Sequence, residues 1–288
     1  MALDSGLGQF LDWGTATTIT VSVGKVVSAS WVGDSAASHQ EGIGADDDII
    51  GGPLAFGGQA SYMVANHDLT QYALRTNYTT SPATGLTDLC FAGGFQGDGR
   101  KQQSCKINTL GLSCAVGGPL TANISWLGLT EAAYSTAAMT AETDVQMQWH
   151  TGVVTVGDAS MQCVGLDLQI NNNLAHVWTH DSATTNQKRW PDAIHVGSQD
   201  VTLSVDVLTR PTTTAWADII ADTLSVAGSA VFTFLGGDTN TETLTITLSN
   251  LSRYTQPISI ASGGGLTTYA LTYEAKKDTS SISITCAA

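Results

Sequence analysis

Charged residues are scarce in this chain, and basic ones are the scarcest. Only 12% of its 288 residues are charged, with 11 Lys and Arg against 25 Asp and Glu, which gives a net charge of −14. Residues 1–150 hold 13 acidic and 5 basic residues, and residues 151–288 hold 12 and 6, so both halves are acidic. A protein that grips nucleic acid neutralises phosphates with Lys and Arg. The composition therefore excludes a DNA clamp, although an acidic surface could border DNA and repel it.

Paired cysteines and long apolar runs are also missing. The five cysteines, Cys90, Cys105, Cys114, Cys163 and Cys286, form no CxxC pair. An odd and widely spaced set indicates free thiols in a reducing compartment. No apolar stretch approaches the ~18 residues that a membrane-spanning helix needs. The opening MALDSGLGQF lacks the basic and apolar regions of a signal peptide. We therefore expect no membrane partner.

Motifs that carry catalysis or bind metals are not found either. The chain has no G-x-S-x-G, H-E-x-x-H or P-loop pattern, so we predict neither an enzyme nor a cofactor. His176 and His180 lie four residues apart, with Asp181 next, but they fall in an expected loop without an obvious third ligand. Ordinary loop histidines are favoured there over zinc. The acidic run at residues 46–48 lacks the EF-hand pattern, which favours a solvated loop over a calcium site.

The second half does contain alternating strands around a long polar loop. Val164, Leu166, Leu168 and Ile170 alternate with small or polar residues, which indicates a strand. A polar loop is expected over residues 171–199, and a second alternating strand over residues 201–207. Residues 215–221, AWADIIA, indicate a short helix.

The first half repeats this order more faintly. An apolar arm over residues 1–14 precedes a strand expected at 15–27, with an extension to residue 32. A loop follows at 33–58, then a strand at 60–65, a short helix at 68–76 with Asp68 as its N-cap, and a hairpin of strands at 105–114 and 120–127. The arm could pack on its own domain or on a neighbouring subunit.

The two halves together predict a mainly β fold made of two tandem domains. The order strand, long loop, strand, short helix, strand, turn and hairpin occurs twice. A period of about 140 residues is too long for a solenoid. It fits two β-sandwich or barrel domains, each with one short helix and one long inter-strand loop. We expect an N-terminal arm at 1–14, a first domain with linker at 15–143 and a second domain at 144–288.

The second-half pattern resembles the tail tube proteins of long-tailed, siphovirus-like bacteriophages. The residues that carry the resemblance are the Asn-Asn-Asn-Leu that ends the strand at residues 171–174, the loop segment Lys-Arg-Trp-Pro-Asp at 188–192, Gly197, and the strand TLSVDV at 202–207. The similarity covers most of residues 15–288. It implies β-sandwich domains whose inner hairpins close with those of neighbouring subunits around a lumen. Duplicated members are expected to form trimeric rings with pseudo-sixfold symmetry rather than hexamers.

The resemblance also implies a function. The chain is expected to be the major tail tube subunit, a structural virion protein made in the host cytoplasm. Its stacked rings would let DNA pass along a negatively charged lumen without specific binding. Its partners would be itself, the tape measure protein, and the tail tip and tail terminator proteins. The alternative is a two-domain β-sandwich adhesin or glycan-binding module on a virion or cell surface.

Candidate contacts between subunits or rings come from the arm and the two loops. The loops differ in charge, with three acids in one and two bases in the other, so opposite charges could meet across an interface. Aromatic residues in polar segments are further candidates. The predicted contact residues are Asp46, Asp47, Asp48, Trp178, Lys188, Arg189, Trp190, Phe10 and Trp13.

Overall fold

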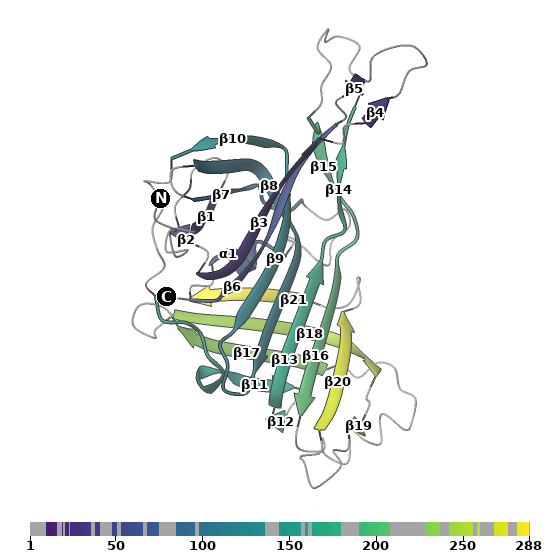
Figure 1. The fold of residues 1–288 in the computed structure, drawn as a ribbon. Helices are drawn as coiled ribbons and strands as arrows, with labels where there is room; N and C mark the ends of the chain where they lie inside the picture. The colour runs from purple at the N-terminus through teal and green to yellow at the C-terminus, as the bar shows by residue number, and fades with distance from the viewer. Residues whose placement is uncertain are drawn as a thin grey trace.

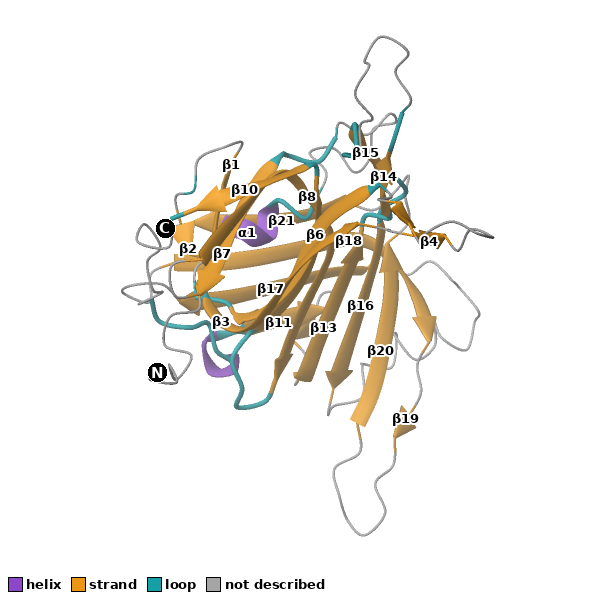
Figure 2. Cartoon of the chain, turned by 45° about the horizontal axis from the view of Figure 1, so that its top comes forward, coloured by secondary structure: helices purple, strands orange, loops and turns teal. Residues whose placement is uncertain are grey.

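The computed structural model is almost entirely antiparallel β-sheet, which confirms the predicted mainly β fold (Figures 1 and 2). Its helical elements, among the described residues, are α1 (Asp68–Gln71) and a 3-10 turn (Trp149–Thr151). None of the helices in this part of the chain is long and apolar enough to cross a bilayer. The structure describes residues 10–15, 19, 21–22, 24–35, 38–40, 48–50, 53–65, 68–74, 85–95, 98–135, 144–156, 159–160, 163–179, 190–207, 228–236, 242–255, 258–259, 268–275 and 281–287.

One sheet runs without a break from the first half of the chain into the second. We call it the inner sheet. Its central junction is the antiparallel pairing of a first-half strand, β8, with a second-half strand, β13. In spatial order its strands are β3 (Lys25–Ser35), β6 (Leu54–Met63), β9 (Thr121–Gly128), β8 (Asp98–Ala115), β13 (Cys163–Asn171), β16 (Asp200–Val207) and β20 (Thr268–Ala275), with the end of β18 (Glu242–Thr255) and β19 (Ile258–Ser259) in the last place.

Two smaller outer sheets cover one face of the inner sheet. In Figure 1, β17, β18 and β21 run across the strands β13 and β16 that lie in front of them. The long strands β8 and β18 take part in both layers, because each pairs with outer strands in its first part and with inner strands in its last part. The other outer strands are β1 (Phe10–Thr15), β2 (Val21–Ser22), β7 (Leu89–Phe95) and β10 (Thr130–Tyr134) in the first half, and β11 (Val153–Val156), β12 (Ala159–Ser160), β17 (Gly228–Gly236) and β21 (Ser281–Ala287) in the second.

The hydrophobic core lies between the two layers and is continuous through both halves. Its largest fully buried side chain is Trp126 of β9. The Trp126 ring stacks on Phe91 with centroids 4.4 Å apart and meets the edge of Trp31 at 5.4 Å. Its indole N–H donates to Oε1 of the buried Gln102 at 2.8 Å. Aromatic pairing and a satisfied polar atom make this cluster the centre of the first-half core.

Several predicted boundaries in the first half are wrong. The strand expected at residues 60–65 starts at Leu54, and the strand expected to end at residue 32 continues to Ser35. The cause lies at Gly57 and Gly58, which carry no strand signal in the sequence. A Cβ on Gly58 would lie 2.2 Å from the Trp126 ring, so the strand needs glycine where the ring packs against it.

The arm and the short helix also differ from expectation. The expected arm at residues 1–14 overlaps strand β1 (Phe10–Thr15), which pairs with β7 of the same chain. The helix at residues 68–76 is shorter than predicted, and Asp68 lies inside it rather than at its N-cap. The hairpin expected at 105–127 is confirmed as β8 and β9, although β8 begins earlier, at Asp98. The second expected helix, at residues 215–221, lies outside the described residues.

Both long loops contain strands of their own. Residues 33–58 include the paired strands β4 (Ser38–Gln40) and β5 (Asp48–Ile50). Residues 171–199 include the antiparallel pair β14 (Leu174–Val177) and β15 (Ala193–Val196). In Figure 1 both pairs stand at the same end of the inner sheet, beyond the ends of its strands. The loops are therefore structured extensions of the sheet over their described residues.

Candidate functional site

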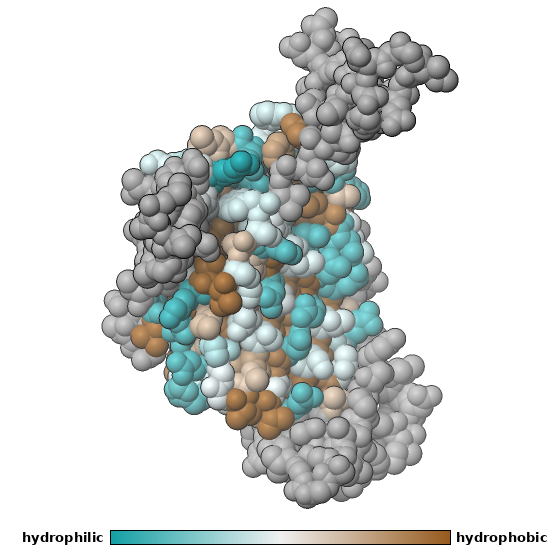
Figure 3. Space-filling model, in the orientation of Figure 1, coloured by the Kyte–Doolittle hydropathy of each residue, from teal (hydrophilic) through white to brown (hydrophobic). Residues whose placement is uncertain are grey.

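The inner sheet has one apolar and one polar face. Side chains alternate across a strand, so the buried residues of β9, β8, β13 and β16 all point to the outer layer. The opposite face is mostly teal and white in Figure 3, where small polar residues cover the strands. From β3 to β20 its residues are Ser28, Ser30, Gln59, Ser61, Asn123, Ser125, Thr109, Ser113, Asp167, Gln169, Thr202, Ser204, Asp206, Thr272 and Glu274.

Three carboxylates on this polar face come from the second half. Asp167, Asp206 and Glu274 are exposed and sit on three neighbouring strands. Asp167 Oδ1 accepts a hydrogen bond from Gln169 Nε2 at 2.6 Å, which fixes the position of the carboxylate. The corresponding stretch of the first half carries serines, Gln59 and an asparagine. The face therefore changes from neutral to acidic along its width.

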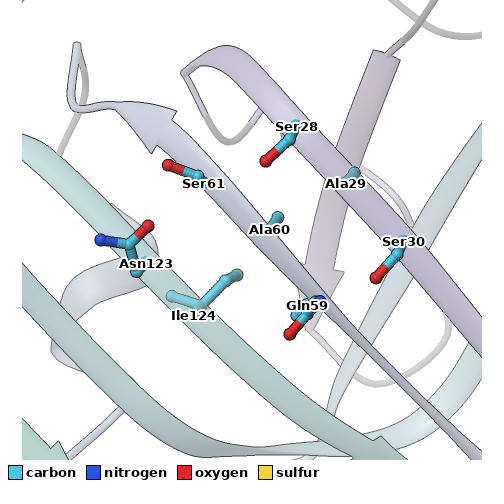
Figure 4. A pocket seen from close by; sticks show the side chains of 8 residues that line it. All are labelled: Ser28, Ala29, Ser30, Gln59, Ala60, Ser61, Asn123 and Ile124. Atoms are coloured by element: carbon cyan, nitrogen blue, oxygen red, sulfur yellow. The ribbon is translucent and has the colours of Figure 1, made fainter.

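A hollow of about 330 Å³ lies against the first-half end of the sheet (Figure 4). It is lined by short side chains of β3, β6 and β9, with Gln59 as the longest polar one. The lining offers hydroxyl and amide groups and contains no ionisable side chain. Across the described residues, no cluster of three or more His, Cys, Asp or Glu could hold a metal ion. We interpret the hollow as part of the sheet edge and not as a ligand pocket. Its lining residues are Ser28, Ala29, Ser30, Gln59, Ala60, Ser61, Asn123 and Ile124.

Within the described part of the chain, both ends of the inner sheet are open edges. Among the pairings of the described residues, β3 has β6 on one side and no strand on the other. At the far end, the pairings given by the described ranges join Thr255 and β19 to β20 alone. Val27, the extra residue of a β-bulge in β3, is 61% exposed. Open edges with exposed apolar residues are surfaces on which a further strand can pair.

A buried amide network holds the junction between the two halves. Asn172 Nδ2 donates to the carbonyls of Ala73 and Ile107, each at 2.9 Å, and so ties the second half to the turn that follows α1 and to β8. Gln199 Nε2 donates to Asn172 Oδ1 at 2.6 Å and to Ala73 O at 3.1 Å. Both amides are almost completely buried. No sequence signal marks this pair, because Asn172 and Gln199 resemble ordinary polar loop residues.

The hairpin β14–β15 leans from the second half over the first. His176 Nε2 lies 2.9 Å from the carbonyl oxygen of Gly128 in β9, and the Trp190 ring meets Phe56 of β6 edge-on at 5.9 Å. His176 also contacts the ring of Trp178, at 5.5 Å. Trp178 and Trp190 are nevertheless 43% and 48% exposed. Their free faces leave apolar surface at the end of the sheet, and a contact of Trp178 and Trp190 with another subunit stays a prediction.

The other predicted contact residues divide into two groups. Trp13 is buried, and its ring lies 5.4 Å from Tyr72 of the same chain, so this part of the arm packs on its own half. Phe10 begins β1 and Asp48 begins β5, but their side chains lie outside the described part. Asp46, Asp47, Lys188 and Arg189 lie outside it altogether, as do His180 and Asp181. The predicted meeting of acidic and basic loops stays a prediction.

Four cysteines, Cys90, Cys105, Cys114 and Cys163, are free thiols whose surroundings suppress ionisation. Burial raises the pKa of Cys114 and of Cys163 to about 11, and it also raises the pKa of Cys90 and of Cys105. Thiolate is the reactive form. These thiols therefore resemble small apolar core residues and not nucleophiles.

We expect the folded protein to react slowly with iodoacetamide at these four cysteines. At pH 8 a thiol with a pKa of about 11 forms on the order of a hundred-fold less thiolate than one with a pKa near 9. Labelling of Cys114 and Cys163 should keep rising with pH up to about 11. Peptide mass spectrometry of native protein, with urea-unfolded protein as the control, measures this. Equal labelling rates in the native and the urea-unfolded protein would contradict the suppressed ionisation of these thiols.

Comparison with known proteins agrees with the geometry of the sheet. A family model described as "Phage tail tube protein" matches residues 1–280. The match includes both halves of the inner sheet, the hairpin β14–β15 and the strands of both outer sheets except β21, which begins at Ser281. No curated protein matches the chain.

Proposed function

This chain belongs to the phage tail tube protein family, and from that premise we propose that its copies form rings that stack into the hollow tube of a phage tail. The observation that carries the proposal is the inner sheet, with its polar face and its two open edges. Sheets of this kind, joined edge to edge, form a closed wall with no unpaired strand left over. The protein then acts by assembly and not by catalysis.

The polar face would line the lumen of the tube. Short hydroxyl and amide side chains on this face leave the bore smooth, and Asp167, Asp206 and Glu274 add negative charge. Like charges keep DNA phosphates away from the wall, so DNA could slide past without specific binding. The apolar face is already covered by the outer sheets of the same chain, which would form the outside of the tube.

We favour a ring of three chains with pseudo-sixfold symmetry over a hexamer. Each chain contributes a first-half and a second-half segment to one continuous sheet, so three chains supply six segments. A closed ring follows when head-to-tail contacts repeat through a rotation that returns to the start. In the virion the tube would contact the tape measure, tail tip and tail terminator proteins, after assembly in the host cytoplasm.

Negative-stain electron microscopy of the concentrated protein tests this proposal. We expect rings or tubes with a central hole, and class averages viewed down the axis should give the symmetry. The alternative function, an adhesin or glycan-binding module, predicts discrete monomers that bind sugars. Monomers under every condition tried, together with measurable sugar binding, would contradict the tube and support the adhesin or glycan-binding function.

Positive charge in the lumen should block function while leaving assembly intact. We expect virions carrying Asp167→Lys, Asp206→Lys and Glu274→Lys to have tails of normal length and infectivity lowered on the order of ten-fold or more, since new lysines would hold DNA phosphates. Plaque-forming units per tailed particle measure the effect.

A matched control places three lysines on the outward face of the second outer sheet. Val153, Leu235 and Ser283 are exposed there, at register positions that point away from the core. Their replacement by lysine should leave infectivity near normal because this face would not meet the passing DNA. An equal loss of infectivity in both variants would contradict a lumen role for the polar face.

A further inference from the structure

The pairing pattern of the second half repeats that of the first, residue by residue. The β8–β9 pairing shifts register between Ile107 and Thr109, and the β18–β20 pairing shifts at the corresponding point, between Arg253 and Thr255. Ser113, four residues after Thr109, pairs with Thr121, and Ser259, four residues after Thr255, pairs with Thr268. The end of β18 together with β19 therefore occupies the place in the second half that β8 has in the first.

The strands at the start of each half match in the same way. The β3–β6 pairing shifts register between Val26 and Ser28, and the β13–β16 pairing shifts between Cys163 and Gly165. A β-bulge at the same point of both strands fixes the alignment without reference to residue identity. Counting from the bulge, Ser30 of β3 corresponds to Asp167 of β13.

Equivalent positions differ in exposure because β13 has a strand on each side, whereas β3 pairs with β6 alone among the described residues. β13 lies against β8, and there Leu166 and Leu168 are buried. Their counterparts in β3, Ala29 and Trp31, are exposed and half-buried. The strand edge that β8 covers in β13 is thus uncovered at the equivalent positions of β3.

We infer that the open edge of β3 pairs with the end of β18 and β19 of a second copy, in the register that joins β13 to β8 inside one chain. Inside the chain Asp167 lies opposite Ser113. The corresponding pair at this seam between chains is Ser30 of one copy and Ser259 of the next. The inference rests on the proposed ring and adds to it the two edges that meet and their alignment.

The seam lacks the buried amides that hold the internal junction. Asn172 and Gln199 correspond to Ser35 and Leu54, which are themselves partners in the β3–β6 pairing. Neither replacement residue can reproduce the amide-to-amide hydrogen bond. The seam should therefore open at a lower urea concentration than the one that unfolds the chain, releasing folded single chains.

Disulfide trapping in the full chain tests the register. We expect the Ser30→Cys, Ser259→Cys double variant, assembled and then oxidised, to give cross-linked dimers and trimers on non-reducing gels. The matched control is Ser28→Cys with Ser259→Cys. Ser28 is on the same face of β3 but two residues away, where the Cβ separation exceeds the span of a disulfide. Wild-type protein and the single variants measure the background from the native cysteines.

The outcomes separate the seam from the proposed function. Rings with efficient cross-linking of the Ser30 pair and little cross-linking of the Ser28 pair support the seam. Rings without the Ser30 cross-link, or with stronger cross-linking of the Ser28 pair, overturn the seam and leave the tube intact. Absence of both rings and cross-links contradicts the seam and the tube together. A ladder that extends beyond trimers would contradict three-chain closure.

Discussion

Replacing Trp126 by alanine is expected to lower the free energy of unfolding by about 4 kcal/mol, a typical cost for deleting a fully buried aromatic side chain. The ring fills the space between Phe91 and Trp31 and is 1% exposed. Its loss would also remove the N–H partner of Gln102 Oε1 in a buried site. Urea unfolding followed by circular dichroism measures the change.

The chain offers a matched control for this variant. Trp178→Ala removes the same side chain from a position that is 43% exposed, so we expect a loss of about 1 kcal/mol or less. Similar losses in the two variants would mean that the Trp126 cluster is not the centre of the first-half core. Trp178→Ala could still weaken assembly, because its exposed face is a candidate contact between subunits.

Replacing Asn172 by alanine is the second large change, with an expected loss of about 3 kcal/mol. The substitution removes two donated hydrogen bonds and leaves the Gln199 amide without its Asn172 acceptor. Buried polar atoms that lose a partner cost about 1–3 kcal/mol each, and Ala73 O keeps one donor in Gln199. Urea unfolding again gives the measurement.

The control for Asn172 is an asparagine on the polar face. Asn123 is exposed on β9, and Asn123→Ala should change the free energy of unfolding by only about 0.5 kcal/mol. If Asn172→Ala proved as mild, the amide network would not be what holds the halves together. If the variant instead unfolded in two steps, the halves would have become separable, which would itself identify the network as their coupling.

The internal junction and the inferred seam between chains are two junctions of different strength. The internal junction joins β8 to β13 and adds buried amides to the strand pairing. The inferred seam would repeat the pairing without the amides. Such a difference lets a chain fold as a unit first and join its neighbours afterwards, because the weaker contact depends on protein concentration. The open edge then acts as an assembly surface and not merely as an aggregation hazard.

Local patterns in the sequence predicted much of the second half. The alternation of Val164 to Ile170 is observed in β13, and the alternation of residues 201–207 in β16. The same periodicity placed Asp167 and Asp206 on the polar side of their strands, although it did not identify them as part of a shared face. In the first half, Gly57 and Gly58 concealed the start of β6, because glycine carries no strand signal and its reason for being there, the Trp126 ring, comes from another strand.

The mainly β character, the acidity of both halves and the lack of recognisable catalytic motifs can all be read from the sequence, because composition and the two-residue period of strands are local properties. The order of neighbouring strands, the edges where the described sheet stays open, and the meeting of Asn172 and Gln199 with Ala73 become visible in the folded chain. Those facts depend on contacts between residues far apart in the chain. Pairing energies between strands are set by the packing of facing side chains, which no local pattern encodes.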